Sequence, residues 1–99
     1  MQKKQKNKPI VWSEYAIRDL ENIYDYISSN FSSEVADKKI DLIFGEVSTL
    51  SQFPRKGKIS TRFNEIRELT VELNTVYYRN NEADIVIATI RARRTKGLL

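Results

Sequence analysis

The sequence predicts a two-layer α+β domain, a helical hairpin packed on a small antiparallel sheet, with its elements in the order β-α-α-β-β-β. Two observations lead to this fold class. Residues 13–30 and 32–53 repeat apolar side chains at the spacing of amphipathic helices. Residues 62–94 instead carry short apolar runs separated by turn-forming residues, a pattern typical of consecutive antiparallel strands.

Composition narrows the chemistry that the chain can perform. Its 99 residues suffice for one domain with a single core, and they include neither cysteine nor histidine. Thiol chemistry is therefore excluded, a zinc site would need carboxylates alone, and any general acid or base must be a Lys, Tyr, Asp or Glu with a shifted pKa. We expect no metal and no cofactor. The lack of cysteine suits a cytoplasmic location, and no apolar run approaches the length of a membrane span.

Charge is distributed unevenly along the chain. Residues 1–9 hold four lysines and no acid, residues 10–53 hold three basic against eight acidic residues, and residues 54–99 hold ten basic against five acidic residues. Segment 1–9 is predicted to be a disordered tail ahead of a single domain formed by residues 10–99. A domain with one basic side is expected to meet a polyanion or an acidic protein on that side.

The helical hairpin is bounded by capping and stop signals. Ser13 is placed to cap the first helix, and the second helix begins at Ser32 or Ser33. It ends before Pro54, because the residue that precedes a proline avoids helical backbone angles. Gly45 inside the second helix lowers its helix propensity and suggests a close approach of the two helices.

One short strand precedes the helices and three antiparallel strands follow them. The first strand spans residues 10–12. Beyond the helices, residues 54–58 are predicted to form a basic turn and residues 62–69 an extended segment that leads to a turn. Residues 76–78 and 85–90 then form a short-looped hairpin. The neighbours Tyr77 and Tyr78 should face opposite sides of the sheet, one in the core and one exposed.

The last strand is predicted to lie inside the sheet with both of its faces covered, because both faces are largely apolar. The two faces hold Ile85, Ile87 and Thr89, and Val86, Ala88 and Ile90. Three arginines follow directly: Arg91, Arg93 and Arg94. A rigid strand should present their guanidinium groups to something negatively charged, unless nearby acids neutralise them. The candidate acids are Glu65, Glu68 and Glu72.

In order and spacing, these elements resemble the RelE/ParE toxins of type II toxin-antitoxin systems, over residues 10–94. The resemblance is carried by Ala16, Leu20, Ile23, Tyr26 and Ile27 in the first helix, Phe53-Pro54 and Gly57 after the second, the Ile66-Arg67-Glu68-Leu69 strand, Tyr78, and the run 85–90 that leads into Arg94. Tyr78 matches the framework tyrosine of the family, which implies a structural role. The long helical hairpin is more similar to the ParE branch than to the RelE branch.

The resemblance implies a cytoplasmic toxin, a small cognate antitoxin that docks on it, and a target in replication or translation. The ParE branch poisons DNA gyrase, a binding function that needs no proton chemistry from the toxin, and we favour this target. The RelE branch cleaves messenger RNA in the ribosomal A site. If this chain were such a nuclease, Arg67, Arg94 and Lys58 would be the catalytic candidates. RelE places a tyrosine a few residues beyond the arginine that Arg94 matches, and residues 95–99 contain none.

Basic residues of the C-terminal half are the predicted contacts for either target. They are Lys56, Lys58, Arg62, Arg67, Arg91, Arg93 and Arg94. An acidic or amphipathic antitoxin segment is expected to lie along the sheet or the helices and to cover apolar surface there. The remaining alternative is a nucleic-acid-binding module without toxicity, whose affinity would fall steeply as salt rises.

Overall fold

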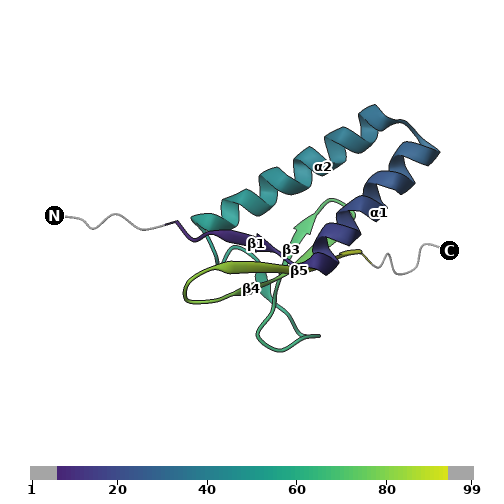
Figure 1. Ribbon diagram of the computed structural model, residues 1–99. Coiled ribbons are helices and arrows are strands. Elements are labelled where there is room, and N and C mark those ends of the chain that lie inside the picture. Colours follow the sequence, from purple (N-terminus) through teal and green to yellow (C-terminus); the bar gives the residue numbers. More distant parts are fainter. Residues whose placement is uncertain (1–6, 94–99) are drawn as a thin grey trace.

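The computed structural model describes residues 7–93, in which two helices cover one face of a five-stranded sheet (Figure 1). Residues 1–6 of the predicted tail, and Arg94 with the residues after it, lie outside this range. The elements are β1 (Ile10–Trp12), α1 (Glu14–Asn30), α2 (Ser33–Ser48), the 3-10 turn η1 (Thr49–Ser51), β2 (Lys58–Ile59), β3 (Arg67–Val71), β4 (Asn74–Asn80) and β5 (Ile85–Ala92). The predicted fold class is confirmed, and the two-residue strand β2 is an addition at the end of the predicted basic turn.

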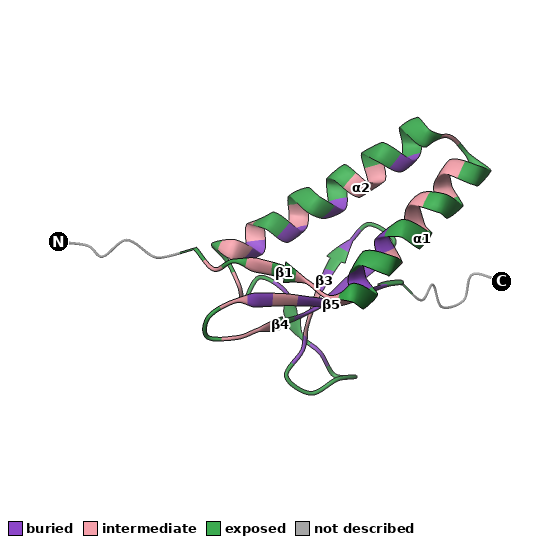
Figure 2. Ribbon diagram, in the orientation of Figure 1, coloured by how far each residue is buried: buried purple, intermediate pink, exposed green. Residues whose placement is uncertain are grey.

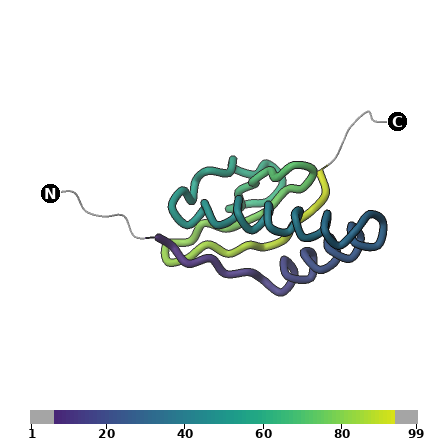
Figure 3. Tube along the Cα trace, turned by 90° about the horizontal axis from the view of Figure 1, so that it is seen from above, coloured from purple at the N-terminus to yellow at the C-terminus, as the bar shows by residue number. Residues whose placement is uncertain are grey.

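The sheet has the strand order β1-β5-β4-β3-β2. Strands β3, β4 and β5 form the predicted antiparallel meander, and β1 pairs parallel with β5. The apolar strand β5 therefore lies between two neighbours, as its sequence predicts. The helical hairpin lies over the sheet, and its turn extends beyond the strands (Figures 1 and 3).

A β-bulge in β5 changes which side chains face the helices. The pairing with β4 passes directly from Ile87 to Thr89, so Ala88 has no partner on that strand. Ile90 therefore joins Ile85 and Ile87 in the core cluster, and Thr89 turns to the other face. The prediction of unbroken alternation over residues 85–90 is wrong at these positions, because the alternation of apolar residues does not reveal a bulge.

The helices cover one face of the sheet, and a loop covers part of the other. The core between helices and sheet consists of Ala16, Leu20, Ile43, Val47, Leu50, Leu69, Val71, Val76, Tyr78, Ile85, Ile87 and Ile90. On the open face, Phe63 of segment 60–66 packs edge to face on Tyr77, with ring centroids 5.4 Å apart. Val86 and Thr89 stay half-buried there, so the prediction of full cover on both faces of β5 is wrong. Tyr77 is only 6% exposed, so the predicted exposed tyrosine is also wrong.

Side chains at the start of α1 close the edge of β5 beyond the end of β1. Ser13 caps α1 as predicted, and its hydroxyl also donates to the carbonyl of Ala88 at 2.7 Å. The Asp19 carboxylate accepts hydrogen bonds from the Thr89 hydroxyl at 2.6 Å and from the Ile90 N–H at 2.9 Å. The exposed ladder groups next to the bulge are thus satisfied by the helix that follows β1.

Two predicted segment boundaries differ from the structure. Lys8, predicted to lie in the disordered tail, belongs to the folded domain: its Nζ donates to the Asn80 Oδ1 and to the Asn81 carbonyl, both at 2.7 Å. Residues 62–66, predicted to be extended, form bends and a turn, and strand β3 begins only at Arg67. Apolar residues at 63 and 66 mimic a strand because both pack inward from the loop.

Gly45 and Gly57 offer a matched test of this packing. A Cβ atom on Gly45 would meet nothing within 4 Å, so the predicted close approach of the helices there is wrong. A Cβ atom on Gly57 would lie 2.7 Å from the Glu68 carbonyl oxygen and 2.8 Å from the Tyr78 ring.

We expect Gly45→Ala to raise the free energy of unfolding by about 1 kcal/mol through helix propensity. Gly57→Ala should lower it by about 2 kcal/mol through overpacking. Urea denaturation followed by circular dichroism measures both, and two changes of the same sign would contradict this packing.

Candidate functional site

Tyr78 and Arg67 anchor the loop that joins the helical layer to the sheet. The buried Tyr78 hydroxyl accepts a hydrogen bond from the Gly57 N–H at 2.9 Å and donates to the Pro54 carbonyl at 2.8 Å. The Arg67 guanidinium donates to the Gly57 carbonyl at 2.7 Å and to the Arg55 carbonyl at 3.4 Å. Tyr78 thus has the structural role that the resemblance implied. Arg67, a predicted contact residue and nuclease candidate, supports the loop from within.

Burial governs the acid-base behaviour of Tyr78. It raises the pKa of the phenol above its ordinary value of 10.0, although the hydrogen bond from Gly57 and the positive charge of Arg67 act in the opposite direction. The neutral phenol is therefore the form that the folded loop requires, since only this form can donate to the Pro54 carbonyl.

The two lysines of the predicted basic turn have different surroundings. The Nζ of Lys56 lies 3.2 Å from Glu46 Oε1 and 3.0 Å from Thr49 Oγ1, which ties this side chain to the end of α2. The side chain of Lys58 is 76% exposed at the sheet edge, and its Nζ lies 4.0 Å from Glu68 Oε1. Lys58 is therefore the more accessible of the two for a partner.

Arg62 and Arg91 converge on one aromatic ring on the open face of the sheet. The Cζ atom of Arg62 lies 5.5 Å from the Phe63 ring centroid, and that of Arg91 lies 5.9 Å from it. Phe63 packs on Tyr77 beneath it. We name these four residues, Arg62, Phe63, Tyr77 and Arg91, the arginine-aromatic platform. Within residues 7–93, no carboxylate forms an ion pair with Arg62 or Arg91.

The arginines at the end of β5 do not form one cluster. Arg91 pairs with Thr75 on the open face. Arg93 turns to the β3–β4 turn, where its guanidinium donates to the Glu72 carbonyl at 3.2 Å and its backbone N–H to the Leu73 carbonyl at 2.7 Å. Arg94 lies outside the described residues. The acids expected to neutralise these arginines pair with other cations instead: Glu65 with Arg79, Glu68 with Lys58 and Glu72 with Lys39.

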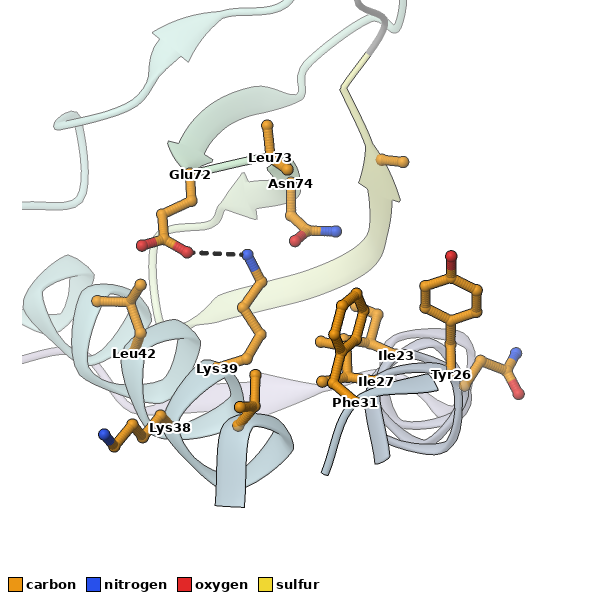
Figure 4. A pocket seen from close by; sticks show the side chains of 13 residues that line it. Ile23, Tyr26, Ile27, Phe31, Lys38, Lys39, Leu42, Glu72, Leu73 and Asn74 are labelled. Atoms are coloured by element: carbon orange, nitrogen blue, oxygen red, sulfur yellow. Dashed lines mark hydrogen bonds and ion pairs between the residues drawn. The ribbon is translucent and has the colours of Figure 1, made fainter. Parts of the chain in front are cut away.

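An apolar groove, which sequence reasoning missed, lies between the helical hairpin and the β3–β4 turn (Figure 4). Its volume is about 910 Å³, and it is lined by Asn22, Ile23, Tyr26, Ile27, Phe31, Val35, Lys38, Lys39, Leu42, Glu72, Leu73, Asn74 and Ala92. Phe31, Tyr26 and Leu73 are largely exposed. An ion pair of 3.1 Å between Lys39 and Glu72 joins α2 to the turn inside the groove (Figure 4).

The groove exists because the hairpin is longer than the sheet beneath it. The buried residues of α1, Ala16 and Leu20, lie in its first half, and the rest of the helix extends past the strands (Figure 2). Ile23 and Ile27 continue the core stripe but are only half-buried there. The signal that could have revealed the groove is the set of apolar residues outside the core stripes: Tyr26, Phe31, Val35 and Leu42.

Neither a metal-binding cluster nor a membrane-spanning helix occurs in the part of the chain that the structure describes. Among residues 7–93, no group of three or more histidine, cysteine, aspartate and glutamate side chains is placed to hold a metal ion. None of the helices in the described range has the length and apolar character that crossing a bilayer requires.

Comparison with known proteins places the chain in a family. The model of the ParE toxin of the type II toxin-antitoxin system, parDE, matches residues 10–97. The chain belongs to the ParE toxin family. A solved structure, a chain of the chromosomal ParDE toxin-antitoxin system from P. aeruginosa, is 26% identical, with a TM-score of 0.81 over 88% of this chain and 97% of that chain. The resemblance seen in the sequence is thus confirmed.

A second solved structure shares the fold of this ParE-family chain. It is a chain of the toxin-antitoxin complex RelBE2 from Mycobacterium tuberculosis, 19% identical, with a TM-score of 0.62 over 88% of this chain and 99% of that chain. At this level of identity the likeness concerns the fold alone. None of the curated proteins compared with the chain matches it.

The two hydrogen bonds of the Tyr78 hydroxyl, to Gly57 and Pro54, form what we name the Tyr78 clamp. This clamp predicts how the stability of this ParE-family domain responds to alkaline pH. Because the folded-state pKa of Tyr78 lies above its unfolded value, the unfolded chain ionises first, and the free energy of unfolding should fall as pH rises past 10. Tyr78→Phe should cost about 1–3 kcal/mol at neutral pH, since the Gly57 N–H loses its acceptor. The fall above pH 10 should also become shallower. Urea denaturation across this pH range measures both, with the exposed Tyr26→Phe as control; a Tyr78→Phe profile that matches wild type would contradict the clamp.

Proposed function

We propose that this ParE-family toxin inhibits cell growth by binding and poisoning DNA gyrase, and that a cognate antitoxin neutralises it. The main support for this proposal is the ParE family match over residues 10–97, because resemblance to the ParE branch implies gyrase poisoning. The P. aeruginosa structure, which is a ParDE toxin-antitoxin system, supports the antitoxin partner.

The placement of the basic side chains also supports binding in preference to catalysis. Of the three nuclease candidates, Arg67 donates to carbonyls of the loop and Lys58 lies at the sheet edge beside Glu68, while Arg94 falls outside the described residues. Arg67 and Lys58 thus have separate partners and do not share a site around one reacting atom. A gyrase-binding surface needs only accessible charge, which Lys58, Arg62 and Arg91 provide on one side of the domain.

Parallel assays of gyrase and of the ribosome test this target. Purified toxin should abolish supercoiling by gyrase and leave messenger RNA on translating ribosomes uncut. Arg91→Glu should weaken the inhibition of gyrase at least tenfold, because it reverses a charge on the binding surface without touching the core. Arg18→Glu on the exposed side of α1 is the matched control and should inhibit like wild type. Cuts at codon positions with unaffected gyrase would overturn the proposal in favour of the RelE-type activity.

The apolar groove is the antitoxin docking site in this proposal. Its exposed apolar side chains suit the apolar face of an amphipathic segment, and Lys38 on its rim suits acidic residues of the same segment. Lys38 places positive charge at this rim although the helical part of the chain is acidic as a whole, whereas Lys39 is paired with Glu72. The partner is therefore an antitoxin segment with apolar residues on one face and carboxylates at its margin.

Two substitutions in the groove test this docking site. Phe31→Asp and Leu73→Asp should each weaken antitoxin binding by more than tenfold, because a carboxylate would be buried against apolar side chains in the complex. Tyr15→Asp is the matched control, since Tyr15 and Phe31 are both 71% exposed and Tyr15 lies outside the groove. Isothermal titration calorimetry with the antitoxin encoded beside the toxin measures the three affinities. Wild-type affinity for both groove variants would exclude this site.

A further inference from the structure

The loop that carries half of the arginine-aromatic platform is held by its own hydrogen bonds. The hydroxyl of Ser60 accepts from the Arg62 N–H at 3.0 Å and from the Phe63 N–H at 3.1 Å, and it donates to Glu68 Oε2 at 2.8 Å. Ser60 is buried, and Phe63 packs on Tyr77 of the sheet. Arg62 is therefore presented from a fixed backbone, as Arg91 is from strand β5, and little ordering entropy remains to be lost when a ligand binds.

The charges around the platform leave Arg62 and Arg91 available. Glu68 is bonded to Ser60 and faces Lys58, and Glu65 pairs with Arg79 at 3.0 Å. The acids of this surface are thus occupied by other groups, and each guanidinium of the platform lies beside the Phe63 ring. A guanidinium stacked on an aromatic ring keeps the N–H groups along its edge free for an anion, and a phosphate accepts two of them at once.

We infer that the arginine-aromatic platform binds phosphodiester groups of DNA. Two guanidinium groups and one partly exposed ring in a small area suit a sugar-phosphate backbone, which presents regularly spaced charges next to apolar sugar and base surface. The apolar groove, which suits a protein segment, is lined by none of these four residues. In its biological setting this inference rests on the proposed function: the toxin would touch the DNA held by gyrase as well as the enzyme.

Binding of DNA by the isolated toxin tests the inference without gyrase. A short fluorescein-labelled duplex is titrated with toxin at several salt concentrations, and anisotropy gives the affinity. Arg62→Gln/Arg91→Gln should bind at least tenfold more weakly than wild type. The slope of log K against log salt should be shallower by about 2, one unit for each phosphate that the variant no longer neutralises. Arg18→Glu on the exposed side of α1 lowers the net charge by the same two units and is the matched control. Phe63→Leu keeps the apolar cover of Tyr77 and should weaken binding to an intermediate degree.

Three outcomes would overturn the inference: no measurable binding of the duplex, an equal loss of affinity in Arg18→Glu, or binding of a poly-glutamate peptide as tight as that of the duplex. The last outcome would assign the platform to an acidic protein segment. Circular dichroism and urea denaturation establish that each variant is folded. The two proposals fail separately. DNA binding without inhibition of supercoiling would contradict gyrase as the target and would be consistent with the platform as a DNA-binding surface. Inhibition of supercoiling without DNA binding would contradict the DNA-binding inference and support gyrase as the target.

Discussion

The hydroxyl of Tyr78 sets the path by which the chain leaves the helical layer and enters the sheet. Tyr78 lies on the central strand β4, fully buried, and its hydrogen bonds to Pro54 and Gly57 bring the loop onto the sheet edge. Strand β2 begins at the next residue after Gly57, and segment 60–66 follows it over the open face. The position of the arginine-aromatic platform therefore depends on one buried phenol. A substitution at Tyr78 would shift the position of Arg62 although the two side chains are not in direct contact.

The bulge at Ala88 has a comparable influence on the other half of the surface. It shifts the alternation of β5 by one residue, so Arg91 pairs with Thr75 on the open face and Ala92 pairs with Asn74 toward the groove. Asp19 of α1 and Ser13, the N-cap of that helix, stabilise this irregularity through hydrogen bonds to Ile90 and Ala88. A regular strand would have placed Arg91 toward the apolar groove, where an unpaired guanidinium is costly. The bulge thus reconciles a continuous core with an arginine that faces solvent.

The sequence predicted the features that depend on neighbouring residues, such as the helix caps. It did not predict the features that depend on contacts between distant segments. Ser13 and Ser32 cap the helices because a short polar side chain ahead of an apolar stripe satisfies free N–H groups whatever lies around it. The separation of Arg91 from Arg93 depends on the bulge, and the role of Arg67 depends on loop carbonyls ten or more residues away. The sequence did not predict the groove either, because the groove arises from the length of the hairpin relative to the sheet, which is a property of the tertiary structure.

The groove and the platform face opposite sides of the sheet but meet at the end of β5. Ala92 lines the groove, its neighbour Arg91 belongs to the platform, and Arg93 is bonded to the turn that carries Leu73. An antitoxin segment anchored in the groove needs to cross only this strand end for its carboxylates to reach Arg91. The apolar surface would then supply most of the affinity, and the short acidic extension would supply the neutralisation by competing for the same guanidinium that a phosphate would bind. In this arrangement the antitoxin and the target would occupy different binding sites and would compete only for Arg91.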